Sequence, residues 1–151
     1  MEKDILNFIE EVKNQTRKLN LEPEEVFLNG NCGNLYHMLA REFSRTHTVV
    51  PVLIVCREEP MHMVTEIDGK LYDITGETSL QKYIEFLTNH TSPFFREKEF
   101  SLRRLVDPEE KEYYTTKMVD MYRYNEDYEQ SETKEQMQRL VKRMNDYSQE
   151  R

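Results

Sequence analysis

Cysteine is scarce in this chain, with two residues among 151. Two cysteines are too few for a disulfide framework in a chain of this size, which argues against a small secreted protein held by disulfide bonds. No apolar run approaches the length that spans a membrane, and the N-terminus lacks the basic and then apolar layout of a signal peptide. We therefore expect a cytoplasmic protein with no membrane partner.

Clusters of basic residues are also missing. The formal net charge is -8, and the two basic pairs that stand out, Arg103-Arg104 and Lys142-Arg143, lie among acidic residues. Affinity for nucleic acid depends on clustered lysine and arginine that neutralise phosphates. The composition therefore predicts no nucleic-acid partner.

The sequence contains no internal repeat and no low-complexity linker. Its length is typical of one domain, but the aliphatic runs are concentrated in residues 1–106. The remainder is rich in Glu, Lys, Tyr, Met and Gln. We predict a compact core over residues 1–106 and a helical extension over residues 107–151, packed on the core or on a partner.

The spacing of apolar residues predicts an α+β fold. Helical periodicity is found over residues 2–19, after Pro23 as far as Gly30, from Cys32 onward with Asn31 as N-cap, and over residues 79–87. A β-branched apolar run predicts a strand over residues 49–56, and Asp68-Gly69 predicts a hairpin over residues 62–75.

The C-terminal extension is predicted to be helical as well. Asp107 is suited to cap a helix with an acidic first turn. A narrow apolar stripe follows on a final helix, formed by Met137, Leu140, Val141 and Met144. We expect this stripe to pack on the body of the domain, with a homodimer or partner contact as the alternative.

Cys32, His62 and Asp73 are the residue types of a cysteine-dependent catalytic triad. A thiol becomes a good nucleophile beside a base, and the base needs a third group that holds its tautomer and orientation. If Asp68-Gly69 forms the two-residue turn, Val64 pairs with Asp73, and His62 and Asp73 share one face of the sheet. Their backbones then lie roughly 7 to 8 Å apart, within reach of the two side chains.

Cys32 falls on the first turn of the predicted third helix. The positive end of the helix dipole favours a thiolate there, and the first-turn amides point toward developing negative charge. Gly33 removes a side chain next to the sulfur, which suits the approach of a substrate. The candidates for oxyanion or substrate binding are Asn29, Asn31, Gly33, Asn34 and Tyr72.

Each of these residues alone also has an ordinary structural explanation. A lone cysteine near a helix start is more often a packing residue than a nucleophile, and Asp73 can simply cap a turn. Cys56 ends an apolar run, where a buried, inert thiol is expected. A metal site built from Cys32, His37, His62 and Asp73 matches no common zinc spacing, so we predict neither a metal nor a cofactor.

Two segments resemble the transglutaminase-like branch of the papain-like cysteine enzymes. Residues 31–36, which read Asn-Cys-Gly-Asn-Leu-Tyr, are similar to the cysteine motif of that family, and residues 62–73 are similar to its histidine strand, tight turn and aspartate strand. The resemblance implies a papain-like α+β core in which Cys32 is the nucleophile, His62 the general base and acid, and Asp73 the orienting group.

Two classes of function follow from this reading. The first is a cysteine-dependent acyl-transfer enzyme acting on a protein, a peptide or a small amide or ester, as a protease, amidase, deamidase or transglutaminase-like enzyme. A small open site favours hydrolysis, although the sequence does not identify the acceptor. The alternative is a non-catalytic acidic binding or inhibitor module built on the same fold.

Overall fold

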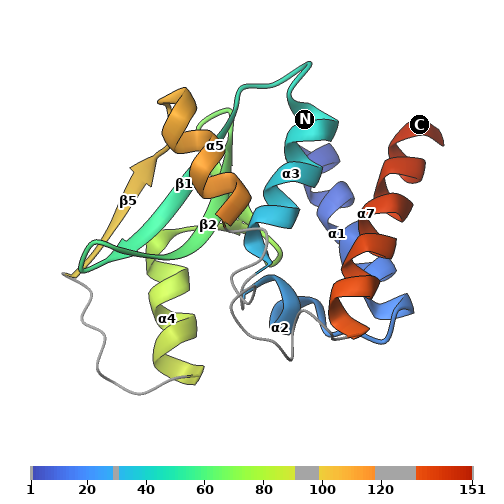
Figure 1. Ribbon diagram of the computed structural model, residues 1–151, viewed down its shortest axis with the longest axis horizontal. Helices are drawn as coiled ribbons and strands as arrows, with labels where there is room; N and C mark the ends of the chain where they lie inside the picture. Colours follow the sequence, from blue (N-terminus) through green and yellow to red (C-terminus); the bar gives the residue numbers. More distant parts are fainter. Residues whose placement is uncertain (1, 29–30, 91–98, 118–131, 151) are drawn as a thin grey trace.

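The computed structural model describes residues 2–28, 31–90, 99–117 and 132–150. One antiparallel sheet lies beside a group of helices (Figure 1). The helices are α1 (Glu2–Lys18), α2 (Pro23–Phe27), α3 (Cys32–Phe43), α4 (Leu80–His90), α5 (Pro108–Lys117) and α7 (Glu132–Glu150). The strands are β1 (Val49–Cys56), β2 (Glu59–Ile67), β3 (Lys70–Asp73), β4 (Gly76–Thr78) and β5 (Phe100–Arg104). The predicted α+β class is confirmed.

The strands are ordered β4-β3-β2-β1-β5, and every neighbouring pair is antiparallel. The β2–β3 hairpin turns at Asp68 and Gly69, whose φ angles are 51° and 87°. A two-residue turn of this kind requires positive φ at both positions, which Gly adopts freely and Asp tolerates. Ile67 pairs with Lys70 and Thr65 with Tyr72, so the predicted register is confirmed along the ladder.

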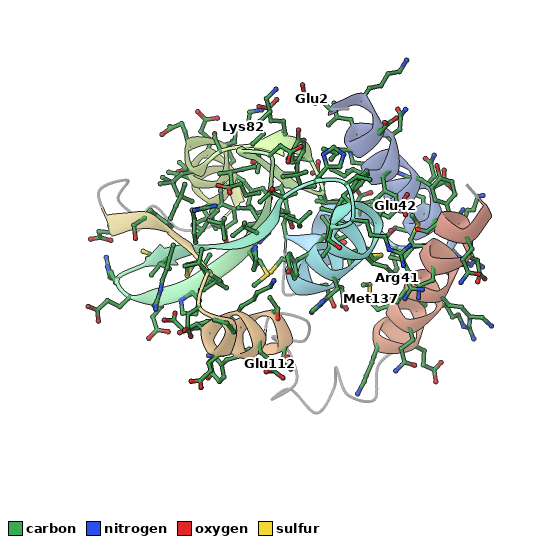
Figure 2. The ribbon with its side chains drawn as sticks, turned by 90° about the horizontal axis from the view of Figure 1, so that it is seen from above. Glu2, Arg41, Glu42, Lys82, Glu112 and Met137 are labelled. Atoms are coloured by element: carbon green, nitrogen blue, oxygen red, sulfur yellow. The ribbon has the colours of Figure 1, made fainter. Side chains whose placement is uncertain are left out.

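The two faces of the sheet are covered by different helices. On one face, Val64 packs with Tyr83 and with other residues of α4. On the other face, Met63 packs in a cluster with Tyr36 of α3 and Tyr114 of α5. Figure 2 shows Lys82 of α4 and Glu112 of α5 on opposite sides of the sheet. This double cover explains why β1 is apolar almost throughout.

The apolar stripe of α7 packs against the N-terminal helices. Met137, Leu140 and Met144 are buried in the same hydrophobic cluster as Phe8 and Ile9 of α1. These three residues of the stripe therefore pack on the body of the domain. A contact of the C-terminal helices with a partner or a second copy stays a prediction, as does the division at residue 106.

The remaining elements agree with the sequence in part. Asp107 caps α5, because its Oδ2 accepts the backbone N–H of Glu110 at 3.0 Å. Strand β4 was not expected, since a strand of three residues is too short to show alternation. The predicted stop at Gly30 lies outside the described residues. Among the described helices, none is both long and apolar enough to cross a membrane.

Candidate active site

Cys32 lies at the edge of β2, in the space beyond the end of β3. Strand β3 ends at Asp73, and its ladder with β2 goes no further back along β2 than Thr65. The backbone N–H of Met63 is therefore not used by β3, and it donates to Sγ of Cys32 at 3.3 Å. The first residue of α3 thus occupies the place where a longer β3 would continue.

His62 lies between the thiol and the carboxylate. Its Nε2 is 3.5 Å from Oδ2 of Asp73, an ion-pair distance, and no described residue is hydrogen-bonded to this buried nitrogen. The side chain of Cys32 is the second polar neighbour of the imidazole and, like Asp73, raises the pKa of His62. Because Nε2 is turned toward Asp73, we infer that Nδ1 is the nitrogen directed at the thiol. The structure therefore brings together the three residues predicted as the triad.

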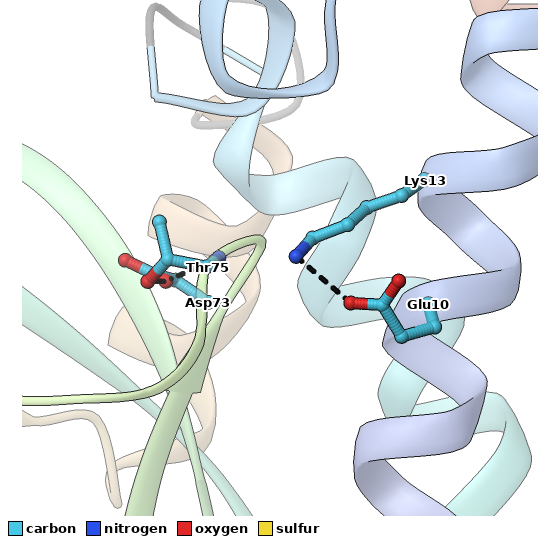
Figure 3. A network of polar contacts seen from close by, with 4 residues as sticks. All are labelled: Glu10, Lys13, Asp73 and Thr75. Atoms are coloured by element: carbon cyan, nitrogen blue, oxygen red, sulfur yellow. Dashed lines mark hydrogen bonds and ion pairs between the residues drawn. The ribbon is translucent and has the colours of Figure 1, made fainter.

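The turn after β3 holds the Asp73 carboxylate in place. Its Oδ1 accepts the backbone N–H of Thr75 at 2.8 Å and the hydroxyl of Thr75 at 2.5 Å (Figure 3). These two bonds occupy Oδ1, which leaves Oδ2 for His62. Thr75 was missed from the sequence, although an aspartate at the end of a strand often accepts the backbone N–H of the residue two positions later, which could have indicated it.

The electrostatics of the site favour an ion pair. Burial alone would lower the pKa of His62, but its contacts with Asp73 and Cys32 outweigh burial and raise that pKa to about 9. Burial would likewise raise the pKa of Asp73, whereas His62 and Thr75 together lower it. A protonated His62 imidazole beside the ionised Asp73 carboxylate is therefore the favoured state near neutral pH.

An aromatic ring covers the face of the imidazole. Tyr83 of α4 is stacked on His62, with ring centroids 4.8 Å apart and ring planes 5° from parallel. The sequence identified Tyr83 only as an apolar position on a helix. Its contact with His62 depends on how α4 is placed over the sheet, and no local pattern in the sequence contains that information.

The triad is buried. The exposed fractions are 3% for Cys32, 1% for His62 and 4% for Asp73. Around Cys32 the hydrophobic cluster includes Met63 and Leu105, with Tyr114 of α5 packed against it. The expected small, open site is therefore not what the structure shows, because the packing of α3, β2 and α5 closes over the sulfur.

The other predicted site residues are placed unequally. Asn31 and Gly33 flank Cys32 and are buried, but the Asn31 amide donates to the carbonyl of Val26 at 3.3 Å. The side-chain amide of Asn34 donates to Oδ1 of Asn31, also at 3.3 Å. Asn34 and Asn31 thus support the start of α3, with Gly33 left next to the thiol.

Tyr72 and Asn29 do not join this group in the described structure. Tyr72 precedes Asp73 on the same strand, so its side chain points to the opposite face of the sheet. There it is buried in a hydrophobic cluster with residues of α1. Asn29 lies outside the described residues. His37, considered as a metal ligand, donates from Nε2 to the carbonyl of Thr115 at 3.2 Å. Within the described ranges, no three His, Cys, Asp or Glu side chains are grouped as metal ligands would be.

Comparison with known proteins gives a family. Residues 5–109 match the family described as Phage YunG-like protein. The match covers more than half of the chain, so the chain belongs to this family. No curated protein matches the chain, and no solved structure matches it.

The resemblance to transglutaminase-like and papain-like proteins is therefore wrong as a family assignment. It depended on short motifs around Cys32 and over residues 62–73. A nucleophile, a base and an orienting group recur in similar arrangements on unrelated folds, so such motifs do not establish a family. The contacts among Cys32, His62 and Asp73 stand independently of that assignment.

Proposed function

We propose that this member of the Phage YunG-like family is a cysteine-dependent acyl-transfer enzyme that acts on an amide or ester. The observation that carries the proposal is the position of His62, which contacts a thiol on one side and a carboxylate on the other. The three side chains come from α3, β2 and β3. What supports a general base over an ordinary core histidine is the identity of the two neighbours, a thiol and a carboxylate, which are the groups that a cysteine triad places beside its histidine.

The reaction follows from these contacts. The Cys32 thiolate attacks the carbonyl carbon, and the carbonyl electron pair moves to the oxygen. The backbone N–H of Gly33, next to the sulfur on the first turn of α3, is the donor we assign to the resulting oxyanion, since the N–H of Asn34 donates to the carbonyl of Asn31 at 3.0 Å. When the tetrahedral intermediate collapses, the bond to the leaving group breaks and the proton held by His62 passes to it. An acyl group then remains on the sulfur as a thioester.

The second half of the reaction regenerates the thiolate. His62, now neutral, takes a proton from water or from an amine as either one attacks the thioester. Water gives a carboxylic acid, and an amine gives a new amide. The substrate is a protein, a peptide or a small amide or ester, and it must displace part of the apolar cover because Cys32 is only 3% exposed.

Thiol reactivity gives the first test, with Cys56 as an internal control of matched burial at 4% exposed. The native protein is treated with iodoacetamide from pH 5 to pH 9, and each cysteine is quantified by peptide mass spectrometry. We expect Cys32 to be alkylated well below pH 8 and Cys56 not to be. Absorbance at 240 nm, compared with that of Cys32→Ser, measures the thiolate without requiring access for a reagent.

Two histidine variants separate the triad from a general effect of removing a histidine. His62→Ala should abolish the difference in alkylation rate between Cys32 and Cys56. His47→Ala removes a second histidine–aspartate contact, between His47 and Asp68, and should leave the difference intact. Equal, slow labelling of both cysteines and no thiolate absorbance near neutral pH would favour a non-catalytic acidic binding or inhibitor module instead.

Covalent chemistry gives the second test. With p-nitrophenyl acetate, intact mass should show an acetyl group on the wild-type protein and none on Cys32→Ser. Decay of this adduct in water indicates hydrolysis, and acetylation of added glycinamide indicates transfer to an amine. If the acetyl group maps to lysine side chains and not to Cys32, the proposal fails.

A further inference from the structure

The imidazole of His62 is contacted on its face as well as on its edges. Asp73 lies at Nε2, the Cys32 thiol at the other edge, and the ring of Tyr83 lies parallel at 4.8 Å between centroids. The described residues therefore restrain His62 in three directions. The contacts with Asp73 and Cys32 set the orientation of the imidazole within its own plane. The stacked ring of Tyr83 limits tilting of the imidazole out of that plane.

Packing alone does not require an aromatic residue at this position. The face of α4 that covers the sheet also buries Ile84 and Leu87, and an aliphatic side chain would fill the same kind of apolar space. A flat ring at 5° from parallel provides two further effects. It covers the imidazole face against water, and its electron-rich face stabilises a positive charge on His62.

The hydroxyl of Tyr83 is not the group that acts. Burial raises the pKa of Tyr83, and the nearby Asp73 carboxylate adds to the effect. The phenol therefore stays protonated and neutral over the pH range in which His62 titrates. Any influence of Tyr83 on the site is exerted by its ring, which is the part that contacts His62.

We propose that Tyr83 is a positioning residue for the catalytic pair, whose stacked ring holds the His62 imidazole in its protonated form between Cys32 and Asp73. This inference rests on the proposed acyl-transfer function and extends it to a residue on a fourth element of the fold, α4. It predicts that the ring matters and that the hydroxyl does not.

Two substitutions at Tyr83 test the inference. Tyr83→Phe keeps the ring, and Tyr83→Leu keeps an apolar side chain but removes the ring. The readout is the rate of Cys32 alkylation by iodoacetamide as a function of pH, with thiolate absorbance at 240 nm in parallel. We expect Tyr83→Phe to match the wild-type protein and Tyr83→Leu to be slower at pH 7 by about three- to tenfold.

The pH dependence distinguishes positioning from a structural defect. Above the pH at which any free thiol ionises, the Tyr83→Leu rate should converge on the wild-type rate, because the thiolate no longer needs an imidazolium partner. If Tyr83→Leu instead blocked the reagent from reaching Cys32 or impaired folding, the alkylation rate would change by a similar factor at every pH. Leu87→Ala, which removes buried atoms of α4 one turn away, should show no such pH-dependent loss.

The outcomes separate the two proposals. If the wild-type protein forms no thiolate near neutral pH, the acyl-transfer function itself fails. If the wild-type protein forms it and Tyr83→Leu behaves identically, only the role of Tyr83 is overturned. An equal drop at all pH values, or a drop in Tyr83→Phe as large as in Tyr83→Leu, also overturns the role assigned to the ring.

Discussion

Asp73 serves two purposes at once because a carboxylate has two oxygens. From the sequence, capping a turn and orienting a histidine were competing explanations of this residue. In the structure, Oδ1 takes both bonds from Thr75 and Oδ2 faces His62. The two explanations are compatible, and the turn is what directs Oδ2 toward the imidazole.

Thr75→Val tests this coupling between the turn and the site. The substitution removes the hydroxyl donor and keeps the shape of the side chain, so one bond to a charged oxygen is lost. We expect unfolding to become easier by about 1.5–3 kcal/mol and alkylation of Cys32 at pH 7 to slow several-fold. Guanidinium titration and iodoacetamide kinetics measure the two effects.

Thr16→Val is the matched control for Thr75→Val. Thr16 is buried in α1, and its hydroxyl donates to the carbonyl of Val12 at 2.6 Å. This variant should lose stability without any change in the reactivity of Cys32. If both valine variants lowered that reactivity equally, the effect would come from general loosening of the fold and not from Asp73.

The raised pKa of His62 predicts how acyl transfer depends on pH. Burial opposes protonation, but Asp73 and Cys32 raise the pKa of His62 to about 9, so the imidazole holds its proton below that pH and loses it above. Expulsion of a poor leaving group needs this proton. Cleavage of a p-nitroanilide should therefore fall as pH rises through about 9. Release of p-nitrophenolate, which needs no proton, should not fall there, and identical profiles for the two substrates would contradict this role of His62.

At the scale of elements, the sequence predicts structure within a hairpin or a helix, but it does not predict how the helices pack on the sheet. The hairpin register follows from Asp68-Gly69 and from strand alternation, so the placement of His62 and Asp73 on one face could be predicted. The position of Cys32 beyond the end of β3, and that of Tyr83 over His62, depend on how α3 and α4 pack on the sheet. Those contacts are made between elements far apart in the chain, and amphipathic patterns show only which face of a helix is buried.

We predict that the packing of α7 contributes strongly to the free energy of unfolding. Leu140 is fully buried in the cluster it shares with α1. Leu140→Ala should lower the free energy of unfolding by about 2–5 kcal/mol, whereas Arg139→Ala, at an exposed position on the same helix, should change it by less than about 0.5 kcal/mol. Guanidinium unfolding measures both. An unfolding midpoint that rises with protein concentration would instead indicate that α7 joins two copies.

At the scale of the whole molecule, the fold gives the two thiols different surroundings. Cys32 and Cys56 are buried to nearly the same extent, at 3% and 4% exposed, so neither burial nor chemical type separates them. What differs is the set of groups that the fold brings to each sulfur. Cys32 receives the N–H of Met63 and the imidazole of His62, whereas Cys56 packs in the apolar cluster under α4.

Selective reactivity of Cys32 should therefore disappear in one step when the protein unfolds. Because α7 shares a hydrophobic cluster with α1 and α3, we expect one cooperative transition. As guanidinium increases, the ratio of Cys32 to Cys56 labelling at pH 7 should fall toward unity at the same midpoint as the far-ultraviolet circular dichroism signal. A ratio that falls well before the helical signal would mean that the site opens locally while the helices remain packed. That result would indicate that the apolar cover of Cys32 by α5 is released independently of the rest of the fold.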